Sequence, residues 1–326
     1  MKILISGAAG FIGRPLCAEL FRQGQAVVAT VRSNNLPIDD VENLTISTID
    51  CDTDWAKALV GVNVVIHLAA RTHVLKDIES DPLAEFRKIN VEGTLNLARQ
   101  SAKAGVRRFI YISSIKVNGE NTVPGKPFTA EDRPAPIGPY ALSKHEAEDG
   151  LCRIASKNDM EVVIIRPTLV YGPGVKANFL TMMNWLNRGI PLPLGAINNK
   201  RSLVSLDNLL NLIITCIEHP GAANQTFLVS DDEDLSTTDL LERMAVALGK
   251  SARLFKVPIH LLEAGAGWLG INTVYQRLCD SLQVDISKTR SLLGWAPPMS
   301  VDIALRKTAE YFLCSLSDKR KLASKH

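Results

Sequence analysis

The first part of the chain alternates short apolar runs with helical patterns, and this alternation constrains the fold more than any other feature. Continuous Val and Ile runs are typical of strands that are buried on both faces, as in a parallel sheet covered by helices. The pattern therefore predicts an α/β fold with a Rossmann-type doubly wound parallel sheet. The apolar runs are KILIS (2–6), AVVATV (26–31), NVVIHLAA (63–70), RRFIYISS (107–114) and MEVVIIRP (160–167).

The pattern loosens after YGPG at 171–174, where helical segments mix with short strands such as QTFLVS at 225–230. We therefore expect two lobes. Residues 1–173 are predicted to form the Rossmann domain, and residues 174–326 a smaller mixed α/β substrate lobe. Segments of the chain can cross between them.

Composition narrows the class of protein. The chain has 326 residues, 46% of them hydrophobic, and a net charge of +3 with acidic and basic residues interleaved, which gives little reason to expect a nucleic-acid partner. Its six cysteines are scattered and form no CxxC, which favours reduced thiols over disulfides or a metal site. No apolar run reaches the roughly 18 to 20 residues of a membrane span. We expect a cytoplasmic protein with no metal and no membrane insertion.

Three glycines stand between the first strand and the first helix, in SGAAGFIG at 6–13. Gly7, Gly10 and Gly13 permit a tight turn and a close approach of the backbone to a pyrophosphate. The amino end of the helix supplies N–H groups and a favourable dipole. In this context the spacing predicts dinucleotide binding.

The end of the second strand bears on the choice of cofactor. An acidic side chain there would bind the ribose hydroxyls of NAD, but the chain has Val31 followed by Arg32. A guanidinium can bind a 2′-phosphate that a carboxylate would repel. Arg32 therefore favours NADP, with NAD as the alternative, unless it is simply an exposed arginine at a strand end.

A serine, a tyrosine and a lysine form a possible catalytic set. Ser114 ends the strand at 107–114, where its side chain would lie at the carboxyl edge of the sheet. Tyr140 and Lys144, in GPYALSK, share one face of a predicted helix. This pair alone would suit an ordinary helix start, but together with the glycine turn and Ser114 it indicates a hydride-transfer site.

The order and spacing of these motifs resemble an extended short-chain dehydrogenase/reductase of the NAD-dependent epimerase/dehydratase family. Further matching segments are IDCD, HLAA, NVEGT, IIRPTLVYGPG, KRSLVSLDNL and SKTRSLLGW. The resemblance implies a homodimer formed through helices at 88–104 and 141–157. The cofactor contacts it implies are Gly7, Gly10, Phe11, Ile12, Gly13, Arg32, Asp50, Cys51, Leu68, Ala69, Ala70, Asn90, Tyr140, Lys144 and Pro167.

The resemblance also implies roles for the catalytic set. Tyr140 is the acid/base, Lys144 holds the nicotinamide ribose and lowers the phenol pKa, and Ser114 hydrogen-bonds the reacting oxygen. The physics agrees, because a free phenol has a pKa near ~10, and adjacent positive charges favour the phenolate.

A UDP-sugar substrate follows from the same resemblance. Arg201 and Arg277 correspond to arginines that bind the nucleotide diphosphate, although either could be a plain surface arginine. Asn178 resembles a substrate-contacting asparagine but could instead cap its helix. Ser114 would contact the sugar.

Departures from the family pattern favour one reaction over others. Ile115 and Lys116 stand where dehydratases carry an Asp-Glu pair, so dehydration is not expected. Asn118 and Leu169 differ from the residues that UDP-galactose epimerases usually have at these two positions. With Arg32, these residues favour a reductase. The segments SSIKVNGE, VKANF, PLPLG and RSLVSLDNL resemble bacterial enzymes of surface polysaccharide synthesis that reduce the C4 ketone of a UDP-4-keto-6-deoxy-N-acetylhexosamine.

Two alternatives remain. One is a UDP-glucose or UDP-N-acetylglucosamine 4-epimerase with tightly bound NAD. The other, a noncatalytic NADP sensor, is less favoured because both Tyr140 and Lys144 are present.

Overall fold

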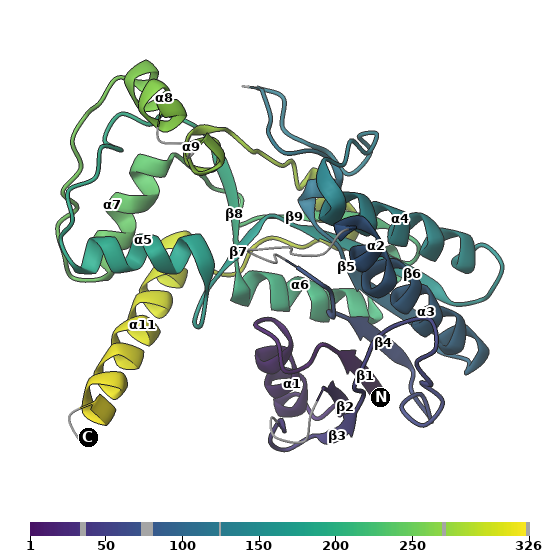
Figure 1. Cartoon of the computed structure of the whole chain (residues 1–326). Helices are drawn as coiled ribbons and strands as arrows, with labels where there is room; N and C mark the ends of the chain where they lie inside the picture. Colours follow the sequence, from purple (N-terminus) through teal and green to yellow (C-terminus); the bar gives the residue numbers. More distant parts are fainter. Residues whose placement is uncertain (33–36, 73–80, 124, 269–271, 324–326) are drawn as a thin grey trace.

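The computed structural model describes residues 1–32, 37–72, 81–123, 125–268 and 272–323, which form a larger and a smaller lobe (Figure 1). The strands are β1 (Lys2–Ser6), β2 (Ala26–Val31), β3 (Glu42–Thr45), β4 (Val64–His67), β5 (Arg108–Ile112), β6 (Glu161–Pro167), β7 (Leu169–Tyr171), β8 (Arg201–Ser205), β9 (Thr226–Val229) and β10 (Asp234–Leu235). The α-helices are α1 (Gly13–Arg22), α2 (Pro82–Arg87), α3 (Thr94–Lys103), α4 (Gly138–Ala155), α5 (Ala177–Asn187), α6 (Leu206–Glu218), α7 (Thr237–Ala247), α8 (Ile259–Trp268), α9 (Asn272–Cys279), α10 (Ser287–Leu293) and α11 (Val301–Ala323).

The larger lobe is built on a seven-stranded parallel sheet in the order β3-β2-β1-β4-β5-β6-β9. The predicted fold class is thus confirmed. The strand order reverses between β1 and β4, which pair from Ile3 opposite Val64 to Ser6 opposite His67. Open α/β sheets bind ligands beyond the carboxyl ends of the strands at such a reversal.

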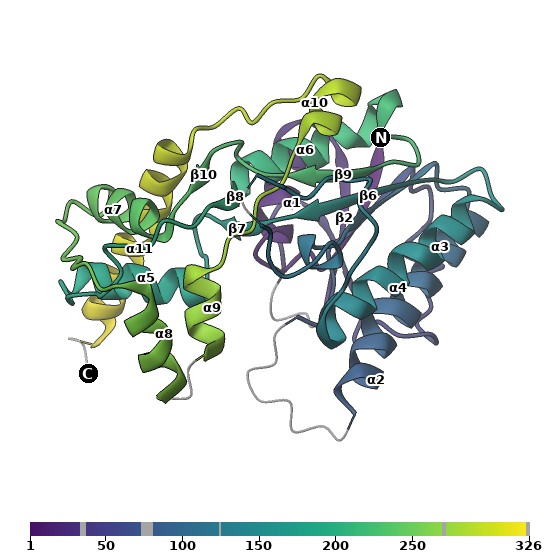
Figure 2. The ribbon, with the colours of Figure 1, turned by 90° about the horizontal axis from the view of Figure 1, so that it is seen from above.

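Helices cover both faces of this sheet (Figures 1 and 2). Side chains of α1 and α6, such as Leu16 and Leu209, share one buried cluster with Ile5 of β1. Those of α3 and α4, such as Leu97 and Leu151, pack on the opposite face. Burial on both faces explains why the strands are continuous runs of Val and Ile.

The chain returns to the larger lobe after entering the smaller one. QTFLVS forms β9, which pairs with β6 as the seventh strand of the large sheet, and α6 covers that sheet. A single boundary at residue 173 therefore does not divide the chain, because residues 206–229 belong with the Rossmann domain. The sequence predicts a strand at 225–230, but it does not predict that this strand pairs with β6.

The smaller lobe has a three-stranded sheet in the order β10-β8-β7 and a core formed with α5, α7 and α11. Methionine and leucine side chains, including Met182, Met183 and Leu241, fill this core. In the described part of the chain, no helix has the length and hydropathy needed to cross a bilayer.

The helix expected at 88–104 is not a single α-helix. A π-helical segment, η1 (Lys88–Gly93), lies between α2 and α3. Such π segments occur mostly as single turns inside helices and frequently mark functional sites. This one carries Asn90.

Candidate active site

The glycine turn leaves no room for side chains. Gly7 has φ +74°, and a Cβ there would lie 2.7 Å from the Ala69 nitrogen. A Cβ on Gly13 would overlap the Gly7 carbonyl oxygen, whereas Gly10 donates its N–H to that oxygen at 3.0 Å. β1, α1 and the segment after β4 thus pack closely, and the backbone of the glycine turn is exposed at the carboxyl ends of the strands. A pyrophosphate could approach this backbone closely.

Other residues predicted to bind the cofactor lie at the carboxyl edge of the same sheet. Leu68, Ala69 and Ala70 follow β4 directly and are partly exposed, and Pro167 ends β6. Phe11 and Ile12, in the glycine turn, pack against the core.

The loop at Asp50 is held in place by hydrogen bonds. The Thr53 hydroxyl donates to the Asp50 carboxylate at 2.9 Å and is the main cause of its lowered pKa. Asn96, on α3, donates to the Asp50 carbonyl at 3.0 Å. Cys51, beside it, is exposed.

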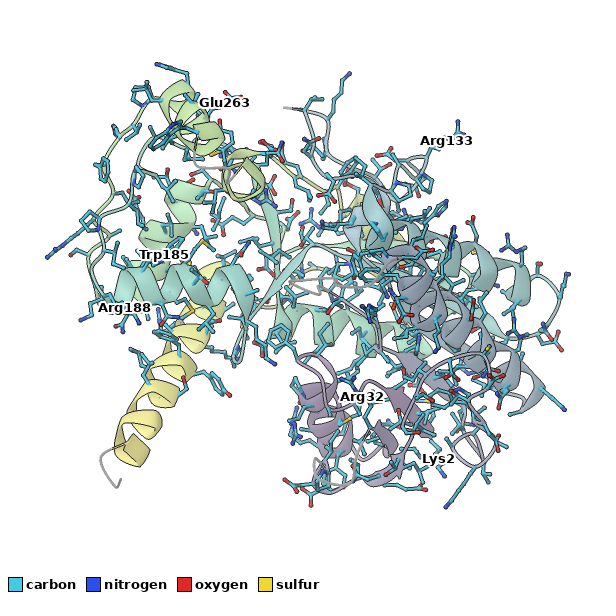
Figure 3. The ribbon with its side chains drawn as sticks, viewed as in Figure 1. Lys2, Arg32, Arg133, Trp185, Arg188 and Glu263 are labelled. Atoms are coloured by element: carbon cyan, nitrogen blue, oxygen red, sulfur yellow. The ribbon has the colours of Figure 1, made fainter. Side chains whose placement is uncertain are left out.

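Arg32 follows β2 and is exposed (Figure 3). Val31, at the position where an acid would bind ribose, is buried in the core beside α1.

The structure brings Ser114, Tyr140 and Lys144 together at the carboxyl end of β5. Ser114 caps a short 3-10 helix, η2 (Ile115–Val117), and its hydroxyl accepts a hydrogen bond from the Lys116 N–H at 3.3 Å. Tyr140 lies in the first turn of α4, after Pro139. The Ser114 side chain lies near the Tyr140 phenol and lowers its pKa slightly.

Burial controls the protonation of Tyr140. It raises the phenol pKa to about 12, against a smaller lowering by the Ser114 side chain. The ring of Phe86 meets the Tyr140 ring edge-on, with centroids 6.1 Å apart.

Lys144 is buried beneath this pair. Its Nζ donates to the Ile112 carbonyl at 2.7 Å and lies 4.3 Å from the centroid of the Tyr111 ring. Burial lowers its pKa to about 7, partly offset by the carboxylate of Glu148 one turn along α4.

A buried network behind Lys144 was not foreseen. Glu148 pairs with Arg166 of β6, with Arg166 Nη2 2.6 Å from the carboxylate, and both side chains are buried. Arg166 also donates to the Asn118 amide oxygen at 2.9 Å, and Asn118 donates to the Thr129 carbonyl at 2.8 Å. The helical spacing of Glu148 from Lys144 was the one available sequence signal.

Asn90 joins η1 to α4. Its amide nitrogen donates to the Ser143 hydroxyl at 3.0 Å, and that hydroxyl donates to the Tyr140 carbonyl at 2.8 Å. Its amide oxygen accepts the Arg71 N–H at 2.8 Å. Asn90 therefore fixes backbone on both sides of the site.

A second unforeseen network lies between β1, β4 and α3. His67 Nδ1 is 2.5 Å from the Ser6 hydroxyl, and Nε2 is 2.9 Å from that of Thr94. Burial, and secondarily Lys144, lowers the His67 pKa to about 3. The imidazole is therefore neutral at pH 7, and it stacks on the Tyr111 ring with the centroids 5.8 Å apart. His67 thus adds no second positive charge near Lys144.

The residues predicted to bind the substrate lie in different environments. Arg201 opens β8, is partly buried and donates to the Asp280 carbonyl at 2.9 Å. Asn178 is exposed in the first turn of α5, whose N-cap is Lys176, so Asn178 does not cap that helix. The side chain of Arg277, in α9, lies outside the described residues.

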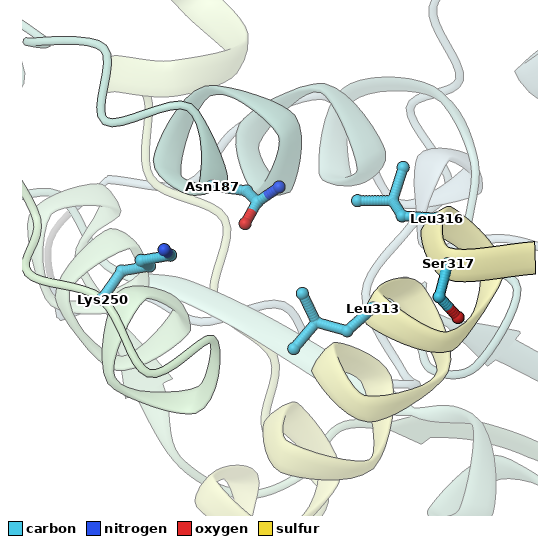
Figure 4. Close-up of a pocket in the computed structure, with 5 residues that line it drawn as sticks. All are labelled: Asn187, Lys250, Leu313, Leu316 and Ser317. Carbon is cyan, nitrogen blue, oxygen red and sulfur yellow. The ribbon is translucent and has the colours of Figure 1, made fainter. Parts of the chain in front are cut away.

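A surface pocket in the smaller lobe contains none of these residues (Figure 4). It lies among α5, α11 and the end of α7, and its lining includes Asn187, Lys250, Leu313, Leu316 and Ser317. Among described residues, no group of three or more His, Cys, Asp or Glu side chains is arranged to hold a metal ion.

Comparison with known proteins gives a family match. Residues 3–230 match the model of the NAD dependent epimerase/dehydratase family. A UDP-glucose 4-epimerase from Vibrio cholerae is 47% identical over 313 residues, which cover 96% of this chain and 95% of that protein. One from Mycolicibacterium smegmatis is 29% identical, covering 96% and 98%.

Solved structures share the fold. The UDP-glucose 4-epimerase of Thermotoga maritima, determined with UDP-glucose, matches with a TM-score of 0.76 and 23% identity, covering 97% of this chain and 100% of that one. The UDP-glucuronic acid 4-epimerase of Bacillus cereus, in complex with NAD, also has a TM-score of 0.76 and 23% identity, covering 96% and 98%.

Proposed function

Because this chain belongs to the NAD-dependent epimerase/dehydratase family, we propose that it is a UDP-hexose 4-epimerase that uses NAD. The observation that carries the proposal is the grouping of Ser114, Tyr140 and Lys144 at the carboxyl end of β5. Identity of 47% over nearly the full length to a UDP-glucose 4-epimerase favours this activity over the reductase expected from the sequence.

Particular residues would hold the two ligands. The glycine turn and the start of α1 would bind the NAD pyrophosphate, and Lys144 the nicotinamide ribose. Arg201 would bind the diphosphate of the UDP-sugar. When bound there, NAD would supply the hydride chemistry needed at C4 of the sugar.

Tyr140 would remove the proton from the 4-hydroxyl and later give it back. A phenol with a pKa of about 12 does not ionise at neutral pH without nearby positive charge. Lys144 supplies that charge when it is protonated, and a phenolate beside it would in turn favour the ammonium. The Ser114 hydroxyl would orient the reacting oxygen.

A reductase is the second candidate, and Arg32 favours it. An exposed guanidinium after β2, with a buried valine in place of the ribose-binding acid, suits NADPH. An NADPH reductase would release its oxidised cofactor after each turnover, whereas an epimerase retains NAD.

One experiment separates the two candidates. The purified protein is assayed for co-purified NAD and incubated, without added cofactor, with UDP-glucose or UDP-N-acetylglucosamine. If the protein is an epimerase, UDP-galactose or UDP-N-acetylgalactosamine should form from the respective substrate. NADPH oxidation with a UDP-4-keto-6-deoxy sugar, without interconversion of the UDP-hexoses, would establish the reductase instead.

A homodimer formed through helices at 88–104 and 141–157 is part of this proposal. Size-exclusion chromatography with light scattering should give twice the chain mass.

A further inference from the structure

An ion pair follows Ser114 closely in the chain. The Nζ of Lys116 is 2.8 and 3.2 Å from the two carboxylate oxygens of Glu120, and the side chains are 32% and 39% exposed. Burial lowers the pKa of the Arg201 guanidinium, and the carboxylates of Asp280 and, to a smaller extent, Glu120 partly offset this lowering. The pair therefore connects two parts of the proposed site.

One end of the pair is fixed at the reacting groups. The backbone N–H of Lys116 donates to the Ser114 hydroxyl, and the Ser114 side chain lies near the Tyr140 phenol. Lys116 thus lies one short helical turn from the hydroxyl that would hold the sugar oxygen.

The other end is fixed to the smaller lobe. Just after Glu120, the Thr122 N–H donates to the Ser281 carbonyl at 2.8 Å. Arg201 donates to the neighbouring Asp280 carbonyl. The segment that carries the ion pair therefore runs between Ser114 and the neighbours of Arg201.

A sugar that contacted Ser114 at one end and Arg201 at the other would pass near this pair. C6 is attached to C5, next to the reacting C4, and it is a hydroxymethyl group in a neutral hexose and a carboxylate in a hexuronate. Lys116 alone would attract that carboxylate. The Glu120 carboxylate neutralises Lys116 and would repel a second anion, which is how a site rejects a competing substrate.

We propose that Glu120 is a specificity-determining residue that selects neutral UDP-hexoses over UDP-hexuronates by neutralising Lys116. The inference rests on the proposed function, since it requires a UDP-sugar at this site. It predicts that removing the carboxylate charge shifts the preference toward the acidic sugar.

The test measures binding without turnover. In the full chain carrying Tyr140→Phe, with NAD present, calorimetry gives the Kd of UDP-glucuronate and of UDP-glucose. Glu120→Gln should lower the ratio of these two constants about tenfold, because an exposed lysine would then face C6. Lys116→Met, which leaves Glu120 alone, should raise the ratio.

Glu131→Gln is the matched control. Glu131 belongs to the same connection between β5 and α4 and pairs with Lys288 at 3.0 Å, but it is 62% exposed. It should leave the ratio unchanged. An unchanged ratio in Glu120→Gln would overturn the inference, as would an equal change in both constants, which would mean that Glu120 acts only on the diphosphate through Arg201.

Turnover by the unmodified chain is measured separately. A chain that binds both sugars and epimerises neither would contradict the proposed function alone, because the binding ratio would still decide the role of Glu120.

Discussion

Lys144 donates a hydrogen bond from Nζ to the carbonyl oxygen of Ile112, the last residue of β5, at 2.7 Å. A backbone carbonyl thus holds the amino group of Lys144, which follows Tyr140 by one turn of α4. The same burial disfavours its charge and lowers its pKa to about 7. Lys144 therefore loses its proton easily near neutral pH.

Lys144→Met should stabilise the protein in a pH-dependent way. The pKa of this lysine is lowered from 10.5 in the unfolded reference to about 7, so the unfolded chain binds the extra proton between these values. Wild-type stability therefore rises with pH across that window. The gain in Tm of the variant, measured by scanning fluorimetry, should be larger at pH 6.5 than at pH 9.5. A gain that is constant with pH would mean that Lys144 is not neutralised by burial.

Tyr140→Phe should reduce turnover by about 10³-fold or more, because it removes the only proposed proton carrier. NAD affinity, measured by fluorescence titration, should change by less than about threefold, since the ring and its packing on Phe86 are kept. Turnover close to the wild-type value would remove Tyr140 from its proposed role.

Gly7→Ala tests the glycine turn against a matched position. Gly7 and Gly24 have nearly the same φ, +74° and +75°, but a Cβ meets the Ala69 nitrogen at Gly7 and no atom within 4 Å at Gly24. Both alanines carry about 1 kcal/mol of backbone strain, measurable by urea denaturation. Gly7→Ala alone should also weaken NAD binding. Equal loss of NAD affinity in both variants would show that close approach at Gly7 is irrelevant.

Glu148→Gln should destabilise the fold by about 3 to 5 kcal/mol, because Arg166 would remain charged and buried with its main partner lost. Replacing both residues with methionine should recover much of that loss in urea denaturation. If the double variant is no more stable than the single one, the cost arises from packing and not from an uncompensated charge.

Arg32→Ala should raise the Kd of NADPH more than that of NADH if its guanidinium binds the 2′-phosphate. Titration with the two cofactors gives both constants. Equal changes would leave the NADP preference without support and would strengthen the assignment of NAD.

Local chemistry made part of this site predictable. The glycine turn and the Tyr140–Lys144 spacing depend on residues close in sequence. The pairing of Glu148 with Arg166, and the bond from Arg166 to Asn118, join three separate segments. Sequence spacing carries no information about such contacts.

The same reasoning explains which strands were recognised. The buried central strands were visible as apolar runs, but β3 reads ENLT and is a largely exposed edge strand, so it has no such pattern. QTFLVS was recognisable as a strand, although nothing local indicates that it pairs with β6 rather than with β7 or β8.

The return of β9 to the large sheet makes the smaller lobe partly an insertion within the Rossmann unit. A fragment ending at residue 173 would lack β9 and would leave the N–H and C=O groups of β6 unpaired along Ile164–Pro167. An open strand edge of this kind recruits other chains. The dinucleotide-binding half expressed alone is therefore expected to aggregate, and the two lobes to unfold in a single transition.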